Sequence, residues 1–113
     1  MSTDDYIAVW LSALRSKRYK QGRRSLSRNG RFCVLGVLCD VLELPYVKVC
    51  ENGSRYYFGW HDVLPKQAQE SVGLNTVKGD FCGGCLTQLN DSGMSFEELA
   101  DFIESKPLGL FKD

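Results

Sequence analysis

The sequence lacks a hydrophobic run long enough to cross a lipid bilayer. Its longest apolar stretch, residues 32–44, has 13 residues and contains Asp40 and Glu43, whereas a spanning helix needs about 20 predominantly apolar residues. The N-terminus carries acid, at Asp4 and Asp5, where a secretory leader would carry base. These absences predict a soluble protein that is not exported and has no membrane contact.

Catalytic signatures are also missing. The chain has one histidine, His61, which lies between Trp60 and Asp62, and no serine or cysteine nucleophile stands in a recognisable motif around it. There is no phosphate-cradling glycine motif, no HExxH pair and no EF-hand loop. The sequence therefore predicts no enzyme activity and no bound cofactor.

The cysteines are few and odd in number, which argues against a disulfide framework in a reducing compartment. Cys82 and Cys85 have the spacing of a redox dithiol or of half a zinc site, and a helix beginning at Cys82 would lower the pKa of the first thiol. A closed zinc site needs about two more ligands, but Cys33 and Cys39 lie roughly 120° apart on a helix. Ordinary packing is the favoured interpretation, with no metal bound, and redox and zinc roles remain as alternatives.

A chain of 113 residues, 43% of them hydrophobic, is long enough for one core and too short for two ordinary domains. We therefore expect a single domain over residues 1–113. Apolar spacing and end signals predict helices over residues 4–16, 32–44, 65–72 and 82–90, and a last helix that begins with the capping box of Ser95 and Glu98.

The central run 32–44 is apolar on every side of a helical wheel, which predicts a helix surrounded by other elements. The expected N-cap of the first helix is Thr3. Gly36 would let a neighbouring backbone approach closely, and Gly73 would end the helix that starts at Pro65.

Residues 47–58 predict a β-hairpin around a type I′ turn at Asn52-Gly53. A two-residue turn would set Glu51 opposite Ser54, Val49 opposite Tyr56 and Val47 opposite Phe58, with the apolar pairs on one face. The other face, which we expect to be open to a ligand, would hold Lys48, Cys50, Arg55 and Tyr57. The predicted fold class is α+β, a small helical domain with one antiparallel β-hairpin.

Charge is distributed very unevenly along the chain, although its formal net charge is zero. Residues 15–31 contain eight basic residues and no acid, with Gly22 and the turn pair Asn29-Gly30 interrupting any helix. This cationic segment carries +8 and the rest of the chain −8. Its charges repel one another unless solvent, the protein's own acids or an anionic partner neutralises them.

Arginine outnumbers lysine in the cationic segment, which favours bidentate binding of phosphate or carboxylate, and Tyr19 within it offers a stacking surface. Neutralisation by the protein's acidic surface is an equally weighted alternative. We expect a phosphate-bearing small molecule, such as a nucleotide, to bind here. The predicted ligand-binding residues are Arg15, Arg18, Tyr19, Arg23, Arg24 and Arg31, with Trp60 as a second stacking surface.

Several segments together resemble a family of small proteins common in tailed-phage and prophage genomes. They are Trp10 to Ser16, Tyr19 to Gly22, Phe32 to Asp40 and Leu89 to Phe96. Many members of that family carry a second cysteine where this chain has Val34, which weakens the case for a thiol site there.

The resemblance implies an accessory protein that acts in the host cytoplasm by binding a host component, including defence systems and their nucleotide messengers. We therefore predict a non-enzymatic, anti-defence protein that sequesters a nucleotide signal. The alternatives are a nucleic-acid-binding module and an inhibitor that binds an acidic host protein. The sequence leaves open whether the protein forms a homo-oligomer.

Overall fold

The computed structural model describes residues 2–49, 51 and 53–112 of the chain. The helices are α1 (Thr3–Arg15), α2 (Val34–Val41), α3 (Lys66–Val72), α4 (Leu86–Asp91) and α5 (Phe96–Glu104). The strands are β1 (Lys20–Gln21), β2 (Ser27–Arg28), β3 (Arg31–Phe32), β4 (Val47–Lys48), β5 (Arg55–Tyr56), β6 (Asp80–Phe81) and β7 (Gly84–Cys85). Five helices and several small sheets confirm the α+β class.

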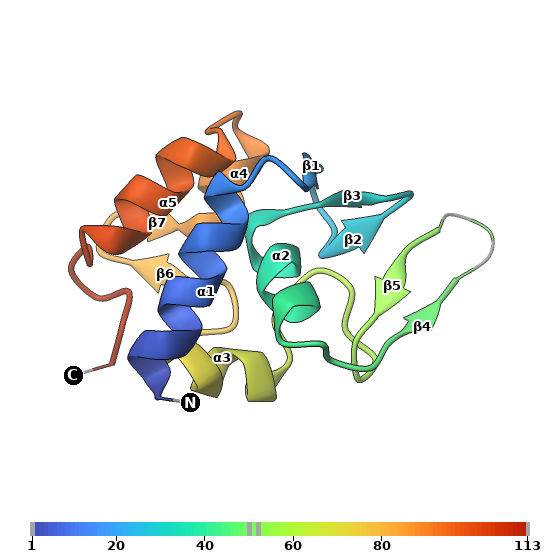
Figure 1. Ribbon diagram of the computed structural model, residues 1–113, viewed down its shortest axis with the longest axis horizontal. Helices are drawn as coiled ribbons and strands as arrows, with labels where there is room; N and C mark the ends of the chain where they lie inside the picture. Colours follow the sequence, from blue (N-terminus) through green and yellow to red (C-terminus); the bar gives the residue numbers. More distant parts are fainter. Residues whose placement is uncertain (1, 50, 52, 113) are drawn as a thin grey trace.

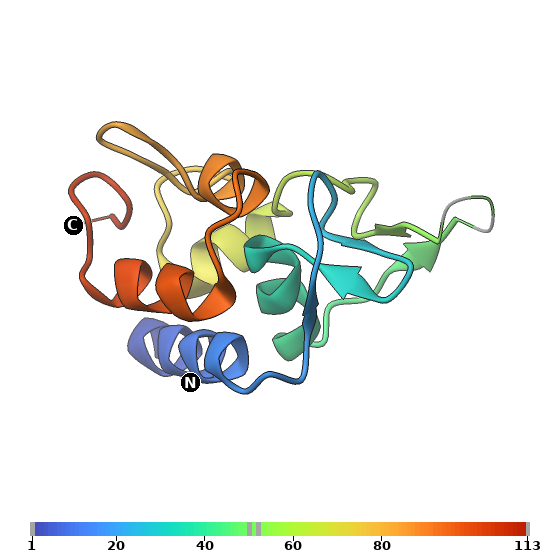
Figure 2. The same cartoon turned by 90° about the horizontal axis from the view of Figure 1, so that it is seen from above.

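The molecule measures 39 × 28 × 25 Å, and its longest dimension ends in the projecting β4–β5 hairpin (Figures 1 and 2). Helices α1, α5 and α3 and the tail after α5 lie on the side away from that hairpin (Figure 1). Within the described residues, no helix has the length and apolar content needed to cross a membrane.

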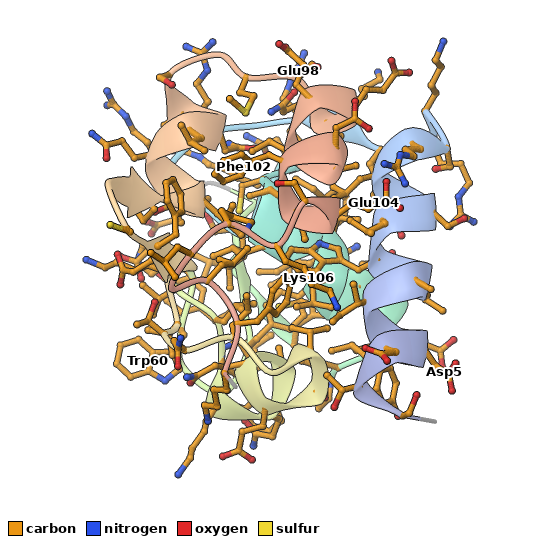
Figure 3. All side chains as sticks on the ribbon, turned by 90° about the vertical axis from the view of Figure 1, so that its left-hand side faces the viewer. Asp5, Trp60, Glu98, Phe102, Glu104 and Lys106 are labelled. Atoms are coloured by element: carbon orange, nitrogen blue, oxygen red, sulfur yellow. The ribbon has the colours of Figure 1, made fainter. Side chains whose placement is uncertain are left out.

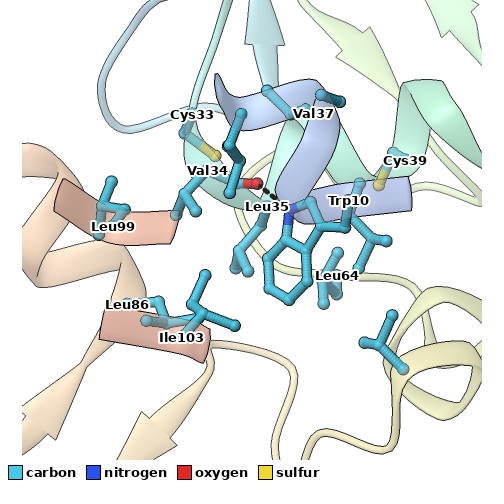
Figure 4. Close-up of a cluster of buried hydrophobic side chains, with 14 of the residues drawn as sticks. Trp10, Cys33, Val34, Leu35, Val37, Cys39, Leu64, Leu86, Leu99 and Ile103 are labelled. Atoms are coloured by element: carbon cyan, nitrogen blue, oxygen red, sulfur yellow. Dashed lines mark hydrogen bonds between the residues drawn. The ribbon is translucent and has the colours of Figure 1, made fainter. Parts of the chain in front are cut away.

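Helix α2 is the centre of the core, as its apolar run predicts. Every residue from Val34 to Cys39 is buried, and α1, α4 and β3 pack against the helix. Figure 4 shows Trp10 of α1 beside it, with the indole Nε1 donating to the Val34 carbonyl at 2.9 Å. The helix is shorter than the predicted 32–44, because Phe32 is paired in β3 and Cys33 serves as N-cap.

Gly36 makes the close backbone approach that the sequence predicts. A Cβ at this position would overlap the carbonyl oxygen of Leu26, which lies in the loop before β2. The Leu26 carbonyl also accepts a hydrogen bond from the Cys33 amide at 3.2 Å. The cationic segment therefore packs directly on the central helix.

Helix ends largely follow the predicted signals. The capping box of Ser95 and Glu98 is confirmed at the start of α5, and Gly73 ends α3 with φ of 70°. The first helix begins one residue earlier than expected, because Ser2 and not Thr3 is its N-cap: the Ser2 hydroxyl accepts from the Asp5 amide at 3.2 Å.

The predicted helix over 82–90 is wrong in its first part. Residues 80–85 form the β6–β7 hairpin, and α4 begins only at Leu86. Cys82 therefore lies at a hairpin tip, and it is Cys85 that occupies the N-cap position of α4. The two glycines between the cysteines favour this tight reversal over a helical turn.

The β4–β5 hairpin forms with a different register from the predicted one. Val47 pairs with Tyr56 and Lys48 with Arg55, and the Val49 amide donates to the Ser54 carbonyl at 2.8 Å. Cys50 and Asn52 of the predicted hairpin lie outside the described residues. Because the slip is two residues and the side-chain period is also two, each side chain keeps its predicted face. It is the apolar face that is open: Tyr57, on the face expected to bind a ligand, is fully buried.

The hairpins are more numerous than the single one expected. The described residues contain three, β2–β3, β4–β5 and β6–β7, and β1 adds to β3 in parallel to complete a sheet of order β1-β3-β2. An isolated antiparallel bridge between Arg28 and Ser54 joins this sheet to the β4–β5 hairpin.

Candidate anion-binding site

The middle of the cationic segment folds into the β2–β3 hairpin. Asn29 and Gly30 form its turn, with φ of 52° and 78°, and positive φ at both central positions is what a type I′ turn requires. The turn sets Arg28 directly opposite Arg31. Directly opposite residues on antiparallel strands project to the same face, so the two guanidinium side chains share one face of the sheet.

A third cation extends this pair. Lys20 of β1 is the partner of Arg31 in the parallel ladder, so Lys20, Arg31 and Arg28 form a row across three adjacent strands. All three are exposed, whereas Phe32 and Ser27, which alternate with them, are buried. We call these three residues the cationic row; it lies on the outer face of the sheet.

A cavity of about 200 Å³ opens beside the cationic row. Its lining residues are Gly22, Arg23, Ser25, Arg28, Asn29 and Arg31, and we call it the arginine cavity. Three arginines thus line one cavity. Planar guanidinium donors match the geometry of phosphate oxygens.

The loop that carries Arg23 is fixed by Asn90, a side chain that is 1% exposed. The Asn90 amide nitrogen donates to the Gly22 carbonyl at 2.8 Å, and its oxygen accepts from the Val34 amide and from the Gln21 side chain, each at 3.0 Å. Gln21 also donates to the Met94 carbonyl at 2.7 Å. One buried amide therefore ties the arginine cavity to the N-terminus of α2 and to α4.

The sequence also allows the protein's own acids to neutralise the cationic segment. In the described structure, two of its eight basic residues pair with a carboxylate. Arg15 pairs with Asp101 at 2.8 Å and Glu104 at 2.9 Å, and Lys17 approaches Glu97 at 3.9 Å. Within the described residues, no carboxylate lies within ion-pair distance of Arg23, Arg28 or Arg31. Like charges directly opposite one another in a sheet are destabilising, so this arrangement favours an anion from outside the chain.

The predicted binding residues fall in several places. Arg23 and Arg31 line the arginine cavity together with Arg28. Arg15 makes its two ion pairs with α5, where Figure 3 shows Glu104 close to α1. Arg18 lies with its guanidinium 5.6 Å from the centre of the Tyr19 ring.

Tyr19 has internal partners. Its hydroxyl donates to Asp40 at 2.5 Å and its ring packs edge-on against Phe32, with ring centres 5.1 Å apart. Burial, followed by the hydrogen bond to Asp40, raises the pKa of Tyr19 to about 12. The residue thus joins β1 to α2.

Arg24 and Trp60 lie apart from the arginine cavity. Arg24 borders a second cavity of about 270 Å³ that also contains Asp62, Asp91 and Lys78 and is therefore of mixed charge. Its backbone amide donates to Asp91 at 3.0 Å. Trp60 is 53% exposed at the periphery of the molecule (Figure 3) and is not among the residues that line the arginine cavity.

Arg28 and Lys20 are additions to the predicted set. The sequence held the signal for Arg28: a two-residue Asn-Gly turn between them places Arg28 and Arg31 opposite one another. Lys20 gave no such signal, because its pairing depends on a parallel contact between β1 and β3.

Other reactive side chains do not assemble into a site. His61 stacks on Tyr56, with ring centres 4.8 Å apart. In the described part of the chain, no three His, Cys, Asp or Glu side chains are grouped so as to hold a metal ion. Burial raises the pKa of the Cys33 thiol to about 11 and also raises that of Cys39, so both thiols stay protonated.

Comparison with known proteins identifies the family and leaves the activity open. No curated protein and no solved structure matches the chain. A family model described as "Domain of unknown function (DUF8296)" matches residues 4–107, which include the cationic segment, the central helix α2 and the helix α4 that carries Asn90. The chain therefore belongs to this DUF8296 family.

Proposed function

We propose that this protein is a phage-encoded, non-enzymatic accessory protein that binds and sequesters a phosphate-bearing small molecule, a nucleotide signal of a host defence system. The observation that carries the proposal is the convergence of Arg23, Arg28 and Arg31 on one cavity, without a carboxylate partner among the described residues. Charge-assisted hydrogen bonds from guanidinium to phosphate are about twice as strong as neutral ones.

The phage origin and the host-cytoplasmic location rest on the resemblance to small proteins of tailed phages. Sequestration requires binding without turnover. Sequestration fits this cavity, because among the described residues no nucleophile is hydrogen-bonded to a general base next to it. The proposed site comprises Arg23, Arg28 and Arg31, with Lys20 at its edge; Arg15 and Tyr19 support the fold around it.

The proposal is tested by thermal unfolding in the presence of inorganic phosphate and of linear and cyclic nucleotides. A ligand that binds the native state stabilises it by about 2.7 kcal/mol at a hundredfold excess over Kd, which is a rise of about 10 °C in the unfolding midpoint for a chain of this size. We expect a selective rise with at least one nucleotide, and recovery of that nucleotide chemically unchanged. No rise with any nucleotide, or its conversion to product, contradicts the proposal.

Paired variants locate the binding site. Arg28→Ala/Arg31→Ala should abolish the thermal shift, because both side chains line the arginine cavity. Lys66→Ala/Lys112→Ala removes the same charge from exposed positions on α3 and on the tail after α5, and should leave the shift unchanged. Equal loss in both double variants would indicate a nonspecific charge effect and contradict the proposed site.

A further inference from the structure

The β4–β5 hairpin presents apolar side chains to solvent, which is the reverse of the usual arrangement. Val47 is 71% exposed and Phe58 51% exposed, while the opposite face carries Arg55 and the fully buried Tyr57. Arg55 fixes that inner face: its guanidinium lies 5.1 Å from the centre of the Phe32 ring and pairs with Asp40 at 3.1 Å. The orientation is therefore set by the core.

The exposed apolar face is hollowed into a groove of about 520 Å³. Its lining includes Tyr46, Val47, Val49, Tyr56 and Phe58. The Tyr56 ring is held in place by His61, with ring centres 4.8 Å apart and planes tilted by 40°. Tyr46 reaches round to the inner face, where the Arg55 guanidinium lies 4.1 Å from the centre of its ring. We call this the aromatic groove. A pre-ordered ring loses little conformational entropy when a flat ligand stacks on it.

The groove and the cationic row share the outer face of the strands. An antiparallel bridge pairs Arg28 with Ser54, and Ser54 in turn lies opposite Val49. Tyr56 follows Ser54 by two residues and lies opposite Val47. Directly opposite residues and those two apart along a strand project to the same side. The outer face therefore runs from Lys20 through Arg31 and Arg28, past the small buried Ser54, to the aromatic groove.

Strands in a sheet lie about 4.8 Å apart, so this continuous surface extends roughly 20 Å from Lys20 to Val49. Cations that hold phosphates beside aromatic rings that stack bases are the combination by which proteins bind single-stranded nucleic acids without sequence preference. A mononucleotide would use one phosphate contact and one aromatic ring, whereas the surface offers several positions of each kind.

We infer that the outer face binds a short single-stranded oligonucleotide, with phosphates on Arg28 and Arg31 and bases stacked on Phe58 and Tyr56. The inference rests on the proposed function, whose ligand it specifies as a chain of several nucleotide units. The exposed ring of Phe58 and the half-buried ring of Tyr56 favour flat bases over the carboxylate side chains of an acidic peptide.

The test compares binding of fluorescein-labelled thymidylate oligomers of increasing length, an abasic deoxyribose-phosphate oligomer and inorganic polyphosphate by fluorescence anisotropy. We expect affinity to rise from the mononucleotide to about four units and then level off, with the abasic oligomer at least about fivefold weaker than the thymidylate of equal length. Equal affinity for thymidylate and abasic oligomers overturns the inference and leaves the proposed function standing. Failure of all these probes, and of every nucleotide in the thermal screen, overturns both.

Phe58→Ala should weaken oligothymidylate binding at least about fivefold and leave polyphosphate binding unchanged, because it removes only a stacking surface. Phe58→Trp should retain the affinity, since it keeps an aromatic face. Leu108→Ala is the matched control: Leu108 is 80% exposed in the tail after α5, at the opposite end of the molecule from the hairpin (Figure 1), and its loss should change neither affinity.

Circular dichroism and sedimentation of each variant complete the experiment. Native-like spectra with the binding losses above support the inference. An unliganded protein that is dimeric, and that becomes monomeric in Phe58→Ala, identifies a second copy of the chain as the occupant of the groove and overturns it. Phe58→Ala that binds oligothymidylate as tightly as the parent protein overturns it as well.

Discussion

Asn90 shows how one residue holds the candidate site from a distance. It lies in α4, yet its buried amide bonds to Gly22, Gln21 and Val34, which are 56 or more positions away in the sequence. The segment Leu89 to Phe96, one of four on which the resemblance to a known family rests, thus supports the arginine cavity. Asn90 therefore has a structural role, because the arginines that it positions lie in a different part of the sequence.

Replacing Asn90 by Ala should lower the free energy of unfolding by at least about 2 kcal/mol. The change leaves the Val34 amide and the Gly22 carbonyl without these partners, and a buried unsatisfied group costs about 1–3 kcal/mol. Urea unfolding measures the loss. Asn75→Ala, which removes an exposed amide that also makes two hydrogen bonds, should cost less than half as much; equal losses would contradict the role of Asn90.

Glycine is needed at position 36 because the Leu26 carbonyl leaves no room for a Cβ, and not because the backbone there has a positive φ. Gly→Ala at an exposed helix position stabilises by up to about 1 kcal/mol, but here the added Cβ would overlap the Leu26 carbonyl. Gly36→Ala should therefore destabilise by about 3 kcal/mol or more, the range of severe overpacking. Thermal unfolding followed by circular dichroism checks this, and a midpoint equal to or above that of the parent chain would refute the close approach.

At the scale of elements, the N-terminal cap of α5 is local and was predictable from the sequence. Ser95 and Glu98 satisfy each other's backbone amides within four residues, so no tertiary contact is needed to specify the start of α5. Where an element depends on a distant partner, the sequence was a poorer guide.

Ser95→Ala should destabilise the protein by about 1 kcal/mol, because the Glu98 amide loses its side-chain acceptor at 3.1 Å. Ser92→Ala is the control, since the Ser92 hydroxyl donates to the Leu89 carbonyl at the end of α4 and caps no N-terminus. Chemical denaturation should show the difference in midpoint. A loss at Ser92 as large as that at Ser95 would be inconsistent with capping as the cause.

The hairpins show why the candidate site was only partly predictable. At Asn29-Gly30 the Asn-Gly pair gives the register that a two-residue turn predicts, with Arg28 opposite Arg31. In the β4–β5 hairpin it does not, because Val47 pairs with Tyr56 and not with Phe58. The two tips touch: the Asn29 amide donates to the Gly53 carbonyl at 3.2 Å, and a Cβ on Gly53 would overlap the Asn29 side chain. This contact between distant turns outweighs the local preference.

The same limit applies to the arginines. Their abundance, and the absence of acids among residues 15–31, were evident from composition. The local Asn-Gly turn brings Arg28 and Arg31 together, whereas the position of Arg23 depends on the parallel pairing of β1 with β3 and on Asn90, neither of which has a local signal. The α+β class, the buried central helix and the cationic segment could be predicted; the register of the hairpin and the membership of the cavity could not.

At the scale of the whole molecule, the basic residues are concentrated in the cationic segment. Because phosphates would bind to these cations, the affinity for the ligand should fall as the salt concentration rises. Each phosphate neutralised on a single strand contributes about −0.7 to the slope of log K against log salt concentration. We expect a slope of about −2 for an oligothymidylate held by Lys20, Arg28 and Arg31. Arg28→Ala should make the slope less steep by about 0.7, as measured by anisotropy titrations from 50 to 200 mM NaCl, whereas Lys66→Ala should leave it unchanged.

The buried thiols and Tyr19 set the alkaline limit of stability. Burial raises the pKa of Cys33 from an ordinary 9.0 to about 11, and burial together with Asp40 raises that of Tyr19 from 10.0 to about 12. Each group therefore keeps its proton in the folded state at a pH where the unfolded chain has lost it. Their contribution to stability is complete below about pH 9 and is lost as pH rises through the folded-state values.

Titration of these groups should leave the free energy of unfolding unchanged up to about pH 9. Between about pH 9 and about pH 12 it should lower that free energy. Tyr19→Phe removes one of the responsible protons, so its decline above pH 10 should be shallower than that of the parent chain, even though loss of the hydrogen bond to Asp40 lowers stability at neutral pH. Urea titrations at one-unit pH intervals measure both slopes. Parallel curves would show that the Tyr19 proton does not contribute, and that the alkaline loss comes from the other buried groups with a raised pKa, the two thiols and Tyr57.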